Sequence, residues 1–380
     1  MGPAGTPLDH AEIIARLRLI RSENVGPVTF GHLLRRYGDA SRALAALPEL
    51  AAQGGLGRRI RIYGRAEAEA ELEANHAIGA RVIVRGMAEY PTLLEQCEDA
   101  PAVFSLRGHG HLLARPAVAM VGARNASANA RRLAHALAET VAAKDYAVVS
   151  VMARGFDTAA HQGALSGGTV AVLGGGIDVI YPRENADLYD RLVEGGALVA
   201  ESPIGTQPQA LNFPARNRII AGLSLAVVVV EAAERSGSLI TARLAGELGR
   251  EVMAVPGSPL DPRCRGSNQL LRDGAHLIET GDDIVAVVAG LGGRHVRAPL
   301  GAPFDGFEPR PPSPETLAAA RREVIEFLDT TPTAVDEIIR RCQFSAPVVL
   351  TVLLEAELAG TVERHPGNMV ARRFTPRSGT

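Results

Sequence analysis

The stretch "FPARNR" (213–218) holds the residues of this sequence best suited to chemistry. It places Arg216, Asn217 and Arg218 just before the apolar run from Leu225 to Val230, which predicts a buried strand. A guanidinium is planar and always charged, so it binds carboxylate or phosphate through two parallel hydrogen bonds. By itself the pair fits three interpretations: a solvated helix start, a catalytic pair, or a phosphate-binding site.

Three other segments repeat this pattern at predicted strand–helix junctions. They are "VGARNAS" (121–127), "ARG" (153–155) and "SGSLIT" (236–241). In a doubly wound sheet such junctions gather at one edge, beyond the carboxyl ends of the strands. The set therefore predicts a phosphate-binding edge. Its predicted residues, with Phe213 beside them for a base, are Gly122, Arg124, Asn125, Ser127, Arg154, Gly155, Phe213, Arg216, Asn217, Arg218, Ser236, Gly237, Ser238 and Thr241.

Ser127 is the predicted N-cap of the helix that follows its junction. The first N–H groups of such a helix are free, and its dipole favours an anion. Asp157 and His161 lie four residues apart and share a helix face. They allow a metal or acid–base interpretation, but no third ligand or nucleophile accompanies them, so we favour structural packing and expect no metal site.

The elements that position these residues alternate between short apolar runs and helical segments. Expected strands cover residues 81–84, 116–122, 147–151, 169–176, 196–202, 225–232 and 250–257. This alternation predicts an α/β fold with a mostly parallel sheet covered on both faces. The patterns GxGxxG and GxxxxGK[ST] are absent, so we expect neither a dinucleotide cofactor nor ATP-driven chemistry.

Composition divides the chain into four regions. Residues 1–77 are predicted to form a small helical domain, 78–287 the α/β domain, 288–314 a Gly/Pro-rich linker, and 315–380 three helices with a two-stranded wing, as in a winged helix. In the first region, Val25–Gly26–Pro27 resembles the turn of a helix-hairpin-helix motif. The alternatives are a phosphate contact or a simple break between two helices.

The bulk numbers exclude several classes. With 46% hydrophobic and 22% charged residues and a net charge of −2, the chain is typical of a soluble globular protein, and a polyanion site would have to be local. Lys144 is the single lysine, so almost all basic side chains are arginine. Three dispersed cysteines and the lack of a signal peptide or an apolar span predict a cytoplasmic protein away from membranes.

The ordered motifs from "VGARNAS" through "ARGFDTAAHQGAL", "FPARNRIIAGLS" and "SGSLITARLAGELG" to "GSNQLLRDGA" resemble the DprA (Smf) family over residues 90–280. The resemblance implies an extended Rossmann-like domain that binds single-stranded DNA, forms a homodimer and loads the RecA recombinase in natural transformation. It also implies an N-terminal SAM/HhH-like domain and a C-terminal winged helix. This sequence departs from the family pattern at Val151 and Ala123.

Two alternatives belong to other classes. Related nucleotide phosphoribohydrolases of the LOG group carry "PGGxGTxxE", but the position of the glutamate is Leu244 here, which argues against an enzyme. A duplex-DNA regulator would read bases with the third helix of the winged helix, near "LTVLLEAELAG". That helix has no Lys or Arg and carries Glu355 and Glu357, so the sequence favours a protein-contact module.

Overall fold

The computed structural model describes residues 8–210, 212–291, 313–365 and 367–373. These form two compact units. The first contains Glu69–Val296, and the second combines Asp9–Ala68 with the C-terminal part of the chain. Most of the predicted linker lies outside the described residues.

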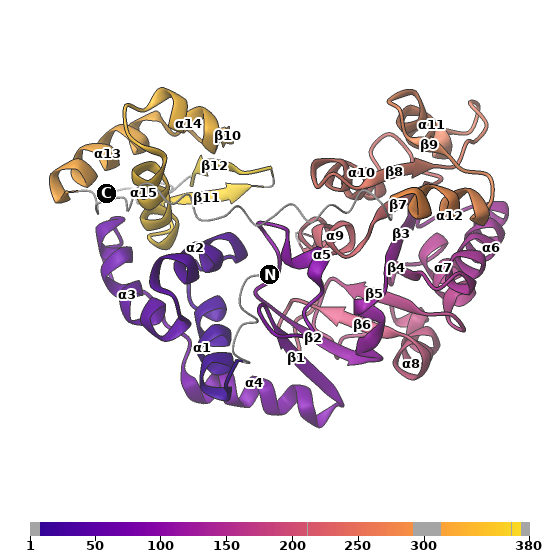
Figure 1. The fold of residues 1–380 in the computed structure, drawn as a ribbon, viewed down its shortest axis with the longest axis horizontal. Helices are drawn as coiled ribbons and strands as arrows, with labels where there is room; N and C mark the ends of the chain where they lie inside the picture. The colour runs from indigo at the N-terminus through magenta and orange to yellow at the C-terminus, as the bar shows by residue number, and fades with distance from the viewer. Residues whose placement is uncertain (1–7, 211, 292–312, 366, 374–380) are drawn as a thin grey trace, which may run out of the picture. The chain divides into compact units, whose positions relative to one another are not determined.

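A nine-stranded sheet organises the first unit, in the order β1-β2-β6-β5-β4-β3-β7-β8-β9 (Figure 1). The strands are β1 (Ala80–Val84), β2 (Val103–Gly108), β3 (Ala117–Gly122), β4 (Ala147–Val151), β5 (Thr169–Leu173), β6 (Ala197–Ala200), β7 (Ala226–Val230), β8 (Glu251–Ala254) and β9 (His276–Leu277). The pairs from β6 to β9 are parallel, while β1–β2 and β2–β6 are antiparallel. The predicted mostly parallel sheet is confirmed, although β2 and β9 were not among the expected strands.

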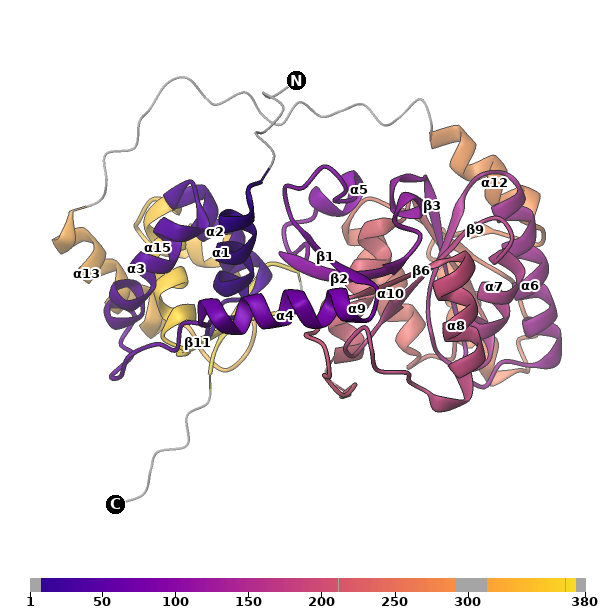
Figure 2. The same cartoon turned by 90° about the horizontal axis from the view of Figure 1, so that it is seen from below.

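Helices cover both faces of this sheet. They are α4 (Arg65–Ala77), α5 (Thr92–Glu95), α6 (Ala128–Ala143), α7 (Phe156–Ala164), α8 (Ala186–Gly195), α9 (Asn212–Leu223), α10 (Gly237–Glu247), α11 (Arg265–Arg272) and α12 (Gly281–Gly290). Side chains alternate along β7: Val227 and Val229 pack with α9 and α10, whereas Val228 and Val230 pack with α6, α7 and α12. Figure 2 shows α6 and α7 lying side by side. This period of two explains the continuous apolar run in the sequence.

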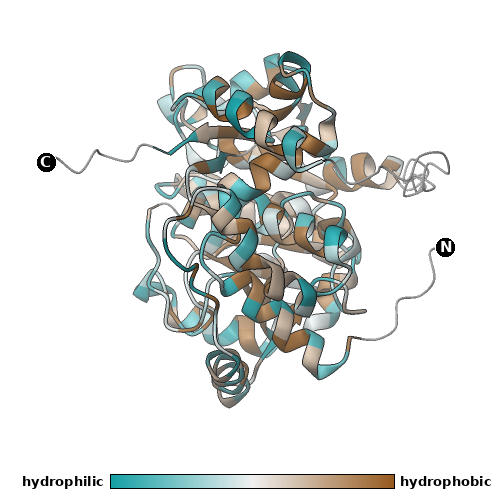
Figure 3. Cartoon of the chain, turned by 90° about the vertical axis from the view of Figure 1, so that its left-hand side faces the viewer, coloured by the Kyte–Doolittle hydropathy of each residue, from teal (hydrophilic) through white to brown (hydrophobic). Residues whose placement is uncertain are grey.

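The second unit joins the two ends of the chain. Its helices are α1 (His10–Arg21), α2 (Pro27–Tyr37), α3 (Ala40–Gln53), α13 (Pro314–Phe327), α14 (Val335–Arg341) and α15 (Ala346–Leu358). The strands β10 (Thr333–Ala334), β11 (Val362–His365) and β12 (Met369–Arg372) form its sheet in the order β10-β12-β11. Helices α13–α15 with this sheet confirm the predicted winged helix. Teal and brown residues alternate along the helices in Figure 3, as expected of amphipathic elements.

Asp157 and His161 on α7 are buried beneath the carboxyl ends of β3 and β4. His161 lies between the Val151 carbonyl oxygen, 3.0 Å from Nε2, and the Thr169 hydroxyl, 2.7 Å from Nδ1. Burial lowers the pKa of His161 to about 4. This neutral, fully bonded imidazole agrees with the predicted packing role.

Asp157 is held next to a single hydroxyl. Ser150 Oγ lies 2.7 Å from the Met120 carbonyl oxygen and 3.2 Å from Asp157 Oδ1. The hydroxyl has one proton and the carbonyl can only accept, so both contacts are satisfied together when Asp157 is itself protonated. Burial raises the pKa of Asp157 to about 7, against smaller opposing effects of Ser150 and nearby arginines.

We predict that Asp157→Asn changes the pH dependence of stability. Folding favours the neutral Asp157 carboxyl, so its contribution is complete below its unfolded pKa near 4 and is lost as the pH rises through about 7. The variant should therefore gain roughly 2–3 kcal/mol relative to wild type between pH 5 and pH 8. The opposite trend of His161, whose contribution is lost as the pH falls through about 4, cancels in the difference.

The measurement is the urea midpoint at several pH values, with Asp190→Asn on the exposed side of α8 as the control substitution. A difference between Asp157→Asn and wild type that stays flat from pH 5 to pH 8 would contradict a protonated Asp157.

Candidate nucleic-acid interface

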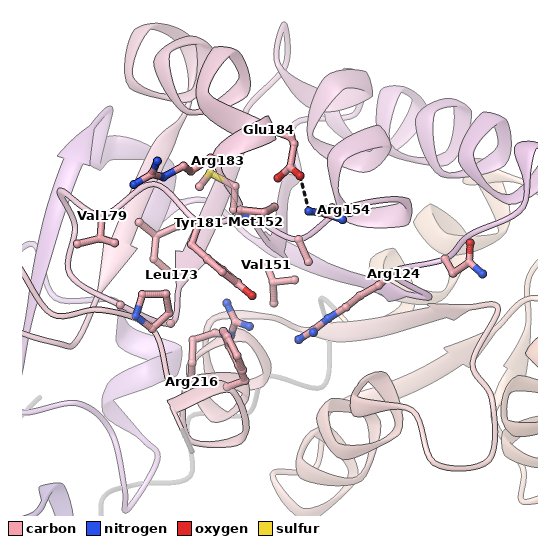
Figure 4. Close-up of a pocket in the computed structure, with 17 residues that line it drawn as sticks. Arg124, Val151, Met152, Arg154, Leu173, Val179, Tyr181, Arg183, Glu184 and Arg216 are labelled. Carbon is pink, nitrogen blue, oxygen red and sulfur yellow. Dashed lines mark hydrogen bonds and ion pairs between the residues drawn. The ribbon is translucent and has the colours of Figure 1, made fainter. Parts of the chain in front are cut away.

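A pocket of about 870 Å³ lies beyond the carboxyl ends of β3, β4 and β5. It is lined by Arg124, Asn125, Val151, Met152, Ala153, Arg154, Leu173, Gly174, Gly175, Val179, Tyr181, Pro182, Arg183, Glu184, Pro208, Phe213 and Arg216. Figure 4 shows Arg124, Tyr181 and Arg216 directed toward the same central space. The loops after three parallel strands thus meet around one cavity, as their topology requires.

Arg216, on the first turns of α9, is the buried cation of this pocket. Its Nη1 donates to the Val172 carbonyl oxygen and its Nε donates to Asn217 Oδ1 at 3.2 Å. Burial lowers the pKa of Arg216 to about 10, Asp157 opposes that change, and Arg124 adds to it. The guanidinium therefore stays charged at neutral pH, yet its hydrogen-bond partners are neutral. A buried charge of this kind favours an anionic ligand.

Phe213 forms an aromatic platform between the charges. Arg124 Cζ lies 5.3 Å from the ring centroid, and Arg216 Cζ lies 6.0 Å from it. Tyr181, which is 51% exposed, stacks on the same ring with a centroid distance of 6.0 Å and an interplanar angle of 27°. Aromatic faces flanked by guanidiniums suit a planar ligand bearing a negative group.

Two glycines allow the loops of the site to approach each other. A Cβ on Gly155, whose φ is +79°, would lie 2.4 Å from the Arg124 carbonyl oxygen. A Cβ on Gly122 would lie 2.4 Å from Phe156 Cγ and 2.6 Å from the Val230 carbonyl oxygen. Both positions therefore require glycine. Arg154, next to Gly155, is exposed and paired with Glu184, as Figure 4 shows.

A second lobe of about 420 Å³ continues from the pocket across Arg124, Phe213 and Arg216. Its wall includes the predicted residues Gly122, Asn217, Ser236, Gly237, Ser238 and Thr241. Ser236 is the N-cap of α10, and its Oγ lies 2.5 Å from Ser238 Oγ. This lobe lies between the loops after β3 and β7, where the strand order reverses direction.

The structure gives two predicted residues other partners. Ser127 does cap α6, but the Glu231 carboxylate accepts hydrogen bonds from its backbone N–H (2.8 Å) and from its hydroxyl (2.5 Å). The helix start expected to be open to an anion is thus filled by a side chain from the end of β7. Arg218 donates to both oxygens of Glu201 at 2.6 Å and lies 3.9 Å from Asp99. Neither Ser127 nor Arg218 lines either lobe.

Some lining residues were given no role by the sequence. Arg183 and Glu184 follow β5 in the first lobe, and Arg235 and Arg263 line the second. These residues follow predicted strands, in or near Gly-rich or Ser-rich loops, and that position could have identified them as candidates for the site. The sequence predicted that Arg124, Arg154, Arg216 and Arg218 converge. The first three line the first lobe, whereas Arg218 is paired with Glu201 and does not.

One group of potential metal ligands occurs in the described part of the chain. Its ligand atoms lie within 4.8 Å of one another and belong to Glu231, Asp261 and Cys264. Asp261 is bound by Arg263 at 2.7 Å, and Glu231 is bound by Ser127. Burial raises the pKa of the Cys264 thiol, which disfavours the thiolate that metals prefer. These residues therefore have internal structural partners.

Family models match three segments of the chain. They describe a DNA recombination-mediator protein A over residues 81–289, a DprA-like N-terminal HHH domain over 10–74, and a DprA winged helix domain over 308–368. None of the helices in the described residues is long and apolar enough to cross a membrane.

Similar proteins with a curated name agree with these models. Protein Smf of Escherichia coli is 40% identical over 287 residues, which cover 75% of each chain. The putative DNA processing protein DprA of Mycobacterium tuberculosis is 37% identical over 360 residues, covering 90% of this chain and 87% of that one.

Two solved structures share the fold. The X-ray structure of DNA processing protein A from Streptococcus pneumoniae matches with a TM-score of 0.61 and 33% identity, covering 74% of this chain and 98% of that chain. A Helicobacter pylori structure, described as showing a single-stranded DNA binding mode of DNA processing protein A, matches with a TM-score of 0.51 and 26% identity, covering 56% and 96%. From the three matched domains and these relatives, we conclude that the chain belongs to the DprA/Smf family of DNA-processing proteins.

Proposed function

We propose that this chain binds single-stranded DNA in the two-lobed pocket. The observation that carries the proposal is Arg216, a buried cation with neutral partners that opens into a cavity beside a second arginine, Arg124. A phosphate at this point would accept hydrogen bonds from both guanidiniums. Ser127 and Arg218 are omitted from the proposed site because Glu231 and Glu201 bind them.

The aromatic platform favours a single strand over a duplex. Phe213 and Tyr181 offer a ring face to a planar group, and a base can reach such a concave surface only when it is unpaired. Stacking of this kind tolerates any base, so we expect little sequence preference. The Helicobacter pylori relative, whose description names single-stranded DNA binding, supports the same ligand.

The enzyme alternative receives little support from the site. The described lining residues of the two lobes include two carboxylates, Asp157 and Glu184. Asp157 is buried and in contact with the Ser150 hydroxyl, and Glu184 is paired with Arg154. Leu244, at the position of the hydrolase glutamate, is a buried core residue. We therefore propose binding without catalysis and without a cofactor.

A third hollow, of about 580 Å³, gives the strand a path out of the pocket. It shares Arg154 with the first lobe and is lined by Arg131, Arg132, His135, Arg154, Gly155, Thr158, Ala159, Gln162 and Asn185. Its described lining residues include no Asp or Glu. Neighbouring phosphates of a bound strand would meet these exposed arginines on α6.

We further propose that the protein forms a homodimer through its Rossmann-like domain and loads RecA on incoming DNA during natural transformation, in the cytoplasm. This finer role rests on the family. Two pockets in a dimer would hold one strand at two points and raise the affinity without new contacts.

The first prediction separates charge from stacking. Arg124→Ala should weaken binding of a fluorescent poly-dT oligomer about tenfold, because one charged hydrogen-bonding group to phosphate is lost. The slope of log K against log salt should become shallower by about 0.7. Phe213→Leu should weaken binding by a similar factor and leave the slope unchanged, since it removes stacking alone.

Arg243→Ala, an exposed arginine on α10 outside the pocket, is the matched control and should bind as wild type does. Unchanged affinity in both pocket variants, or equal affinity of the wild type for a matching duplex, would contradict the proposed site.

A second prediction concerns the path over α6. The double variant Arg131→Ala/Arg132→Ala should bind a thymidine dinucleotide within twofold of wild type, because that ligand fills only the first lobe. It should bind a decamer about tenfold more weakly, with a shallower salt dependence. Equal losses for both lengths, measured by fluorescence competition, would place the defect in the pocket and not on the path.

A third prediction tests the RecA role. Light scattering should give the mass of a dimer, and wild type should shorten the lag of RecA assembly on single-stranded DNA. Arg124→Ala should dimerise normally and shorten that lag much less. A monomer at micromolar concentration, or equal lags for the two proteins, would reject the corresponding part of the proposal.

A further inference from the structure

The second unit contains two motifs that often contact DNA, and they are in contact with each other. The turn before α2 resembles the hairpin of a helix-hairpin-helix motif and lies within the matched HHH domain, and α15 is the third helix of the winged helix. Asn24, in that turn, donates from Nδ2 to the Leu358 carbonyl oxygen at the end of α15, at 3.0 Å. Thr29, in the first turn of α2, donates from Oγ1 to Glu357 Oε2 at 2.7 Å.

Two buried carboxylates of α15 take part in hydrogen-bond networks that extend to the N-terminal helices. Glu357 is 6% exposed and also accepts from Arg364 of the wing, at 2.6 Å from Nη2. Glu355 is 1% exposed and accepts from Arg321 Nε at 2.6 Å. Arg321 Nη2 in turn lies 3.4 Å from Oε1 of Gln53, at the end of α3. Each carboxylate of α15 is therefore neutralised in a network that reaches the N-terminal helices.

Apolar and steric contacts agree with the polar ones. Leu354 and Leu358 are buried, but they lie outside the core cluster that the winged helix forms with its own elements. Gly54, the C-cap of α3, has no room for a side chain: a Cβ there would lie 1.9 Å from the Glu355 carbonyl oxygen and 2.9 Å from Ala359 Cβ. Helix α15 lies directly against α2 and α3 (Figure 1).

From these contacts we infer that the N-terminal helical domain is the built-in protein partner of the winged helix, so that α15 serves a contact within the chain and not a contact with nucleic acid. The occupant of the α2–α3 surface is α15 of the same chain. Helix α15 contains no Lys or Arg, and its two carboxylates are already paired within the winged helix, so even a released α15 would offer no cation to a DNA groove. Arg364 of the wing is paired with Glu357 inside the winged helix itself, so this arginine is committed to an internal carboxylate.

This inference stands apart from the proposed DNA pocket, because it concerns the other unit. The test substitution is Gly54→Ala in the full chain. The three atoms nearest to the new methyl group all belong to residues 355 and 359, so the substitution is aimed at the docked state. Gly57→Ala, where a Cβ meets nothing within 4 Å, is the matched control. Thr29→Val, which keeps the side-chain shape and removes the bond to Glu357, is a milder second variant.

Hydrogen exchange followed by mass spectrometry gives the readout. Peptides of α15 and α3 should exchange at least tenfold faster in Gly54→Ala than in wild type, with a smaller increase in Thr29→Val and none in Gly57→Ala. Peptides of β3–β7 should be unchanged, and the affinity for poly-dT should stay within twofold of wild type.

Three results would overturn the inference. Unchanged exchange in both interface variants would mean that the surfaces are not docked in solution. Protection of α15 that rises with protein concentration would assign the contact to a second copy. A gain of duplex binding in Gly54→Ala would show that docking hides a DNA-binding surface and does not replace one.

Discussion

A positive charge buried without a carboxylate partner is the constraint on which the DNA site depends. The Arg216 guanidinium is held by a carbonyl and an amide oxygen, and burial already lowers its pKa to about 10. The buried acid Asp157 acts on Arg216 electrostatically, but burial raises the pKa of Asp157 to about 7, which weakens its negative charge relative to an ordinary carboxylate. Because desolvation has already occurred in the free protein, an entering phosphate meets a cation with few waters left to displace.

The sheet supplies the precision that this arrangement requires. Parallel strands bring the loops after β3, β4, β5 and β7 to one edge, and the reversal of strand order between β3 and β7 opens the second lobe. Gly122 and Gly155 then let these loops close on one another, since a methyl group at either position would overlap backbone or ring atoms. Substituting either glycine would separate the guanidiniums without changing any charge.

Local patterns in the sequence were sufficient for the sheet and for the junctions, but not for the partners of single side chains. Ser127 is bound by Glu231, which lies 104 residues away, and no local pattern indicates that contact. The separation of Arg218 from the pocket could have been predicted from the sequence, because it follows from local helical geometry. Residues two apart point to nearly opposite sides of a helix, so Arg216 and Arg218 could not serve one ligand together. The missed β2 is an antiparallel strand between β1 and β6, outside the alternation of parallel strands and helices that guided the prediction.

The two units use arginine in two different ways, and both depend on the planar guanidinium that lysine lacks. In the second unit, Arg321 and Arg364 make multiple hydrogen bonds to the buried carboxylates Glu355 and Glu357, which a point charge such as lysine could not do as well. Removing one partner of such a pair typically costs about 3–5 kcal/mol, so these arginines are committed to structure. In the first unit, Arg216 has the same side chain without an acid. The difference between a structural and a binding arginine therefore lies in whether the fold supplies the anion.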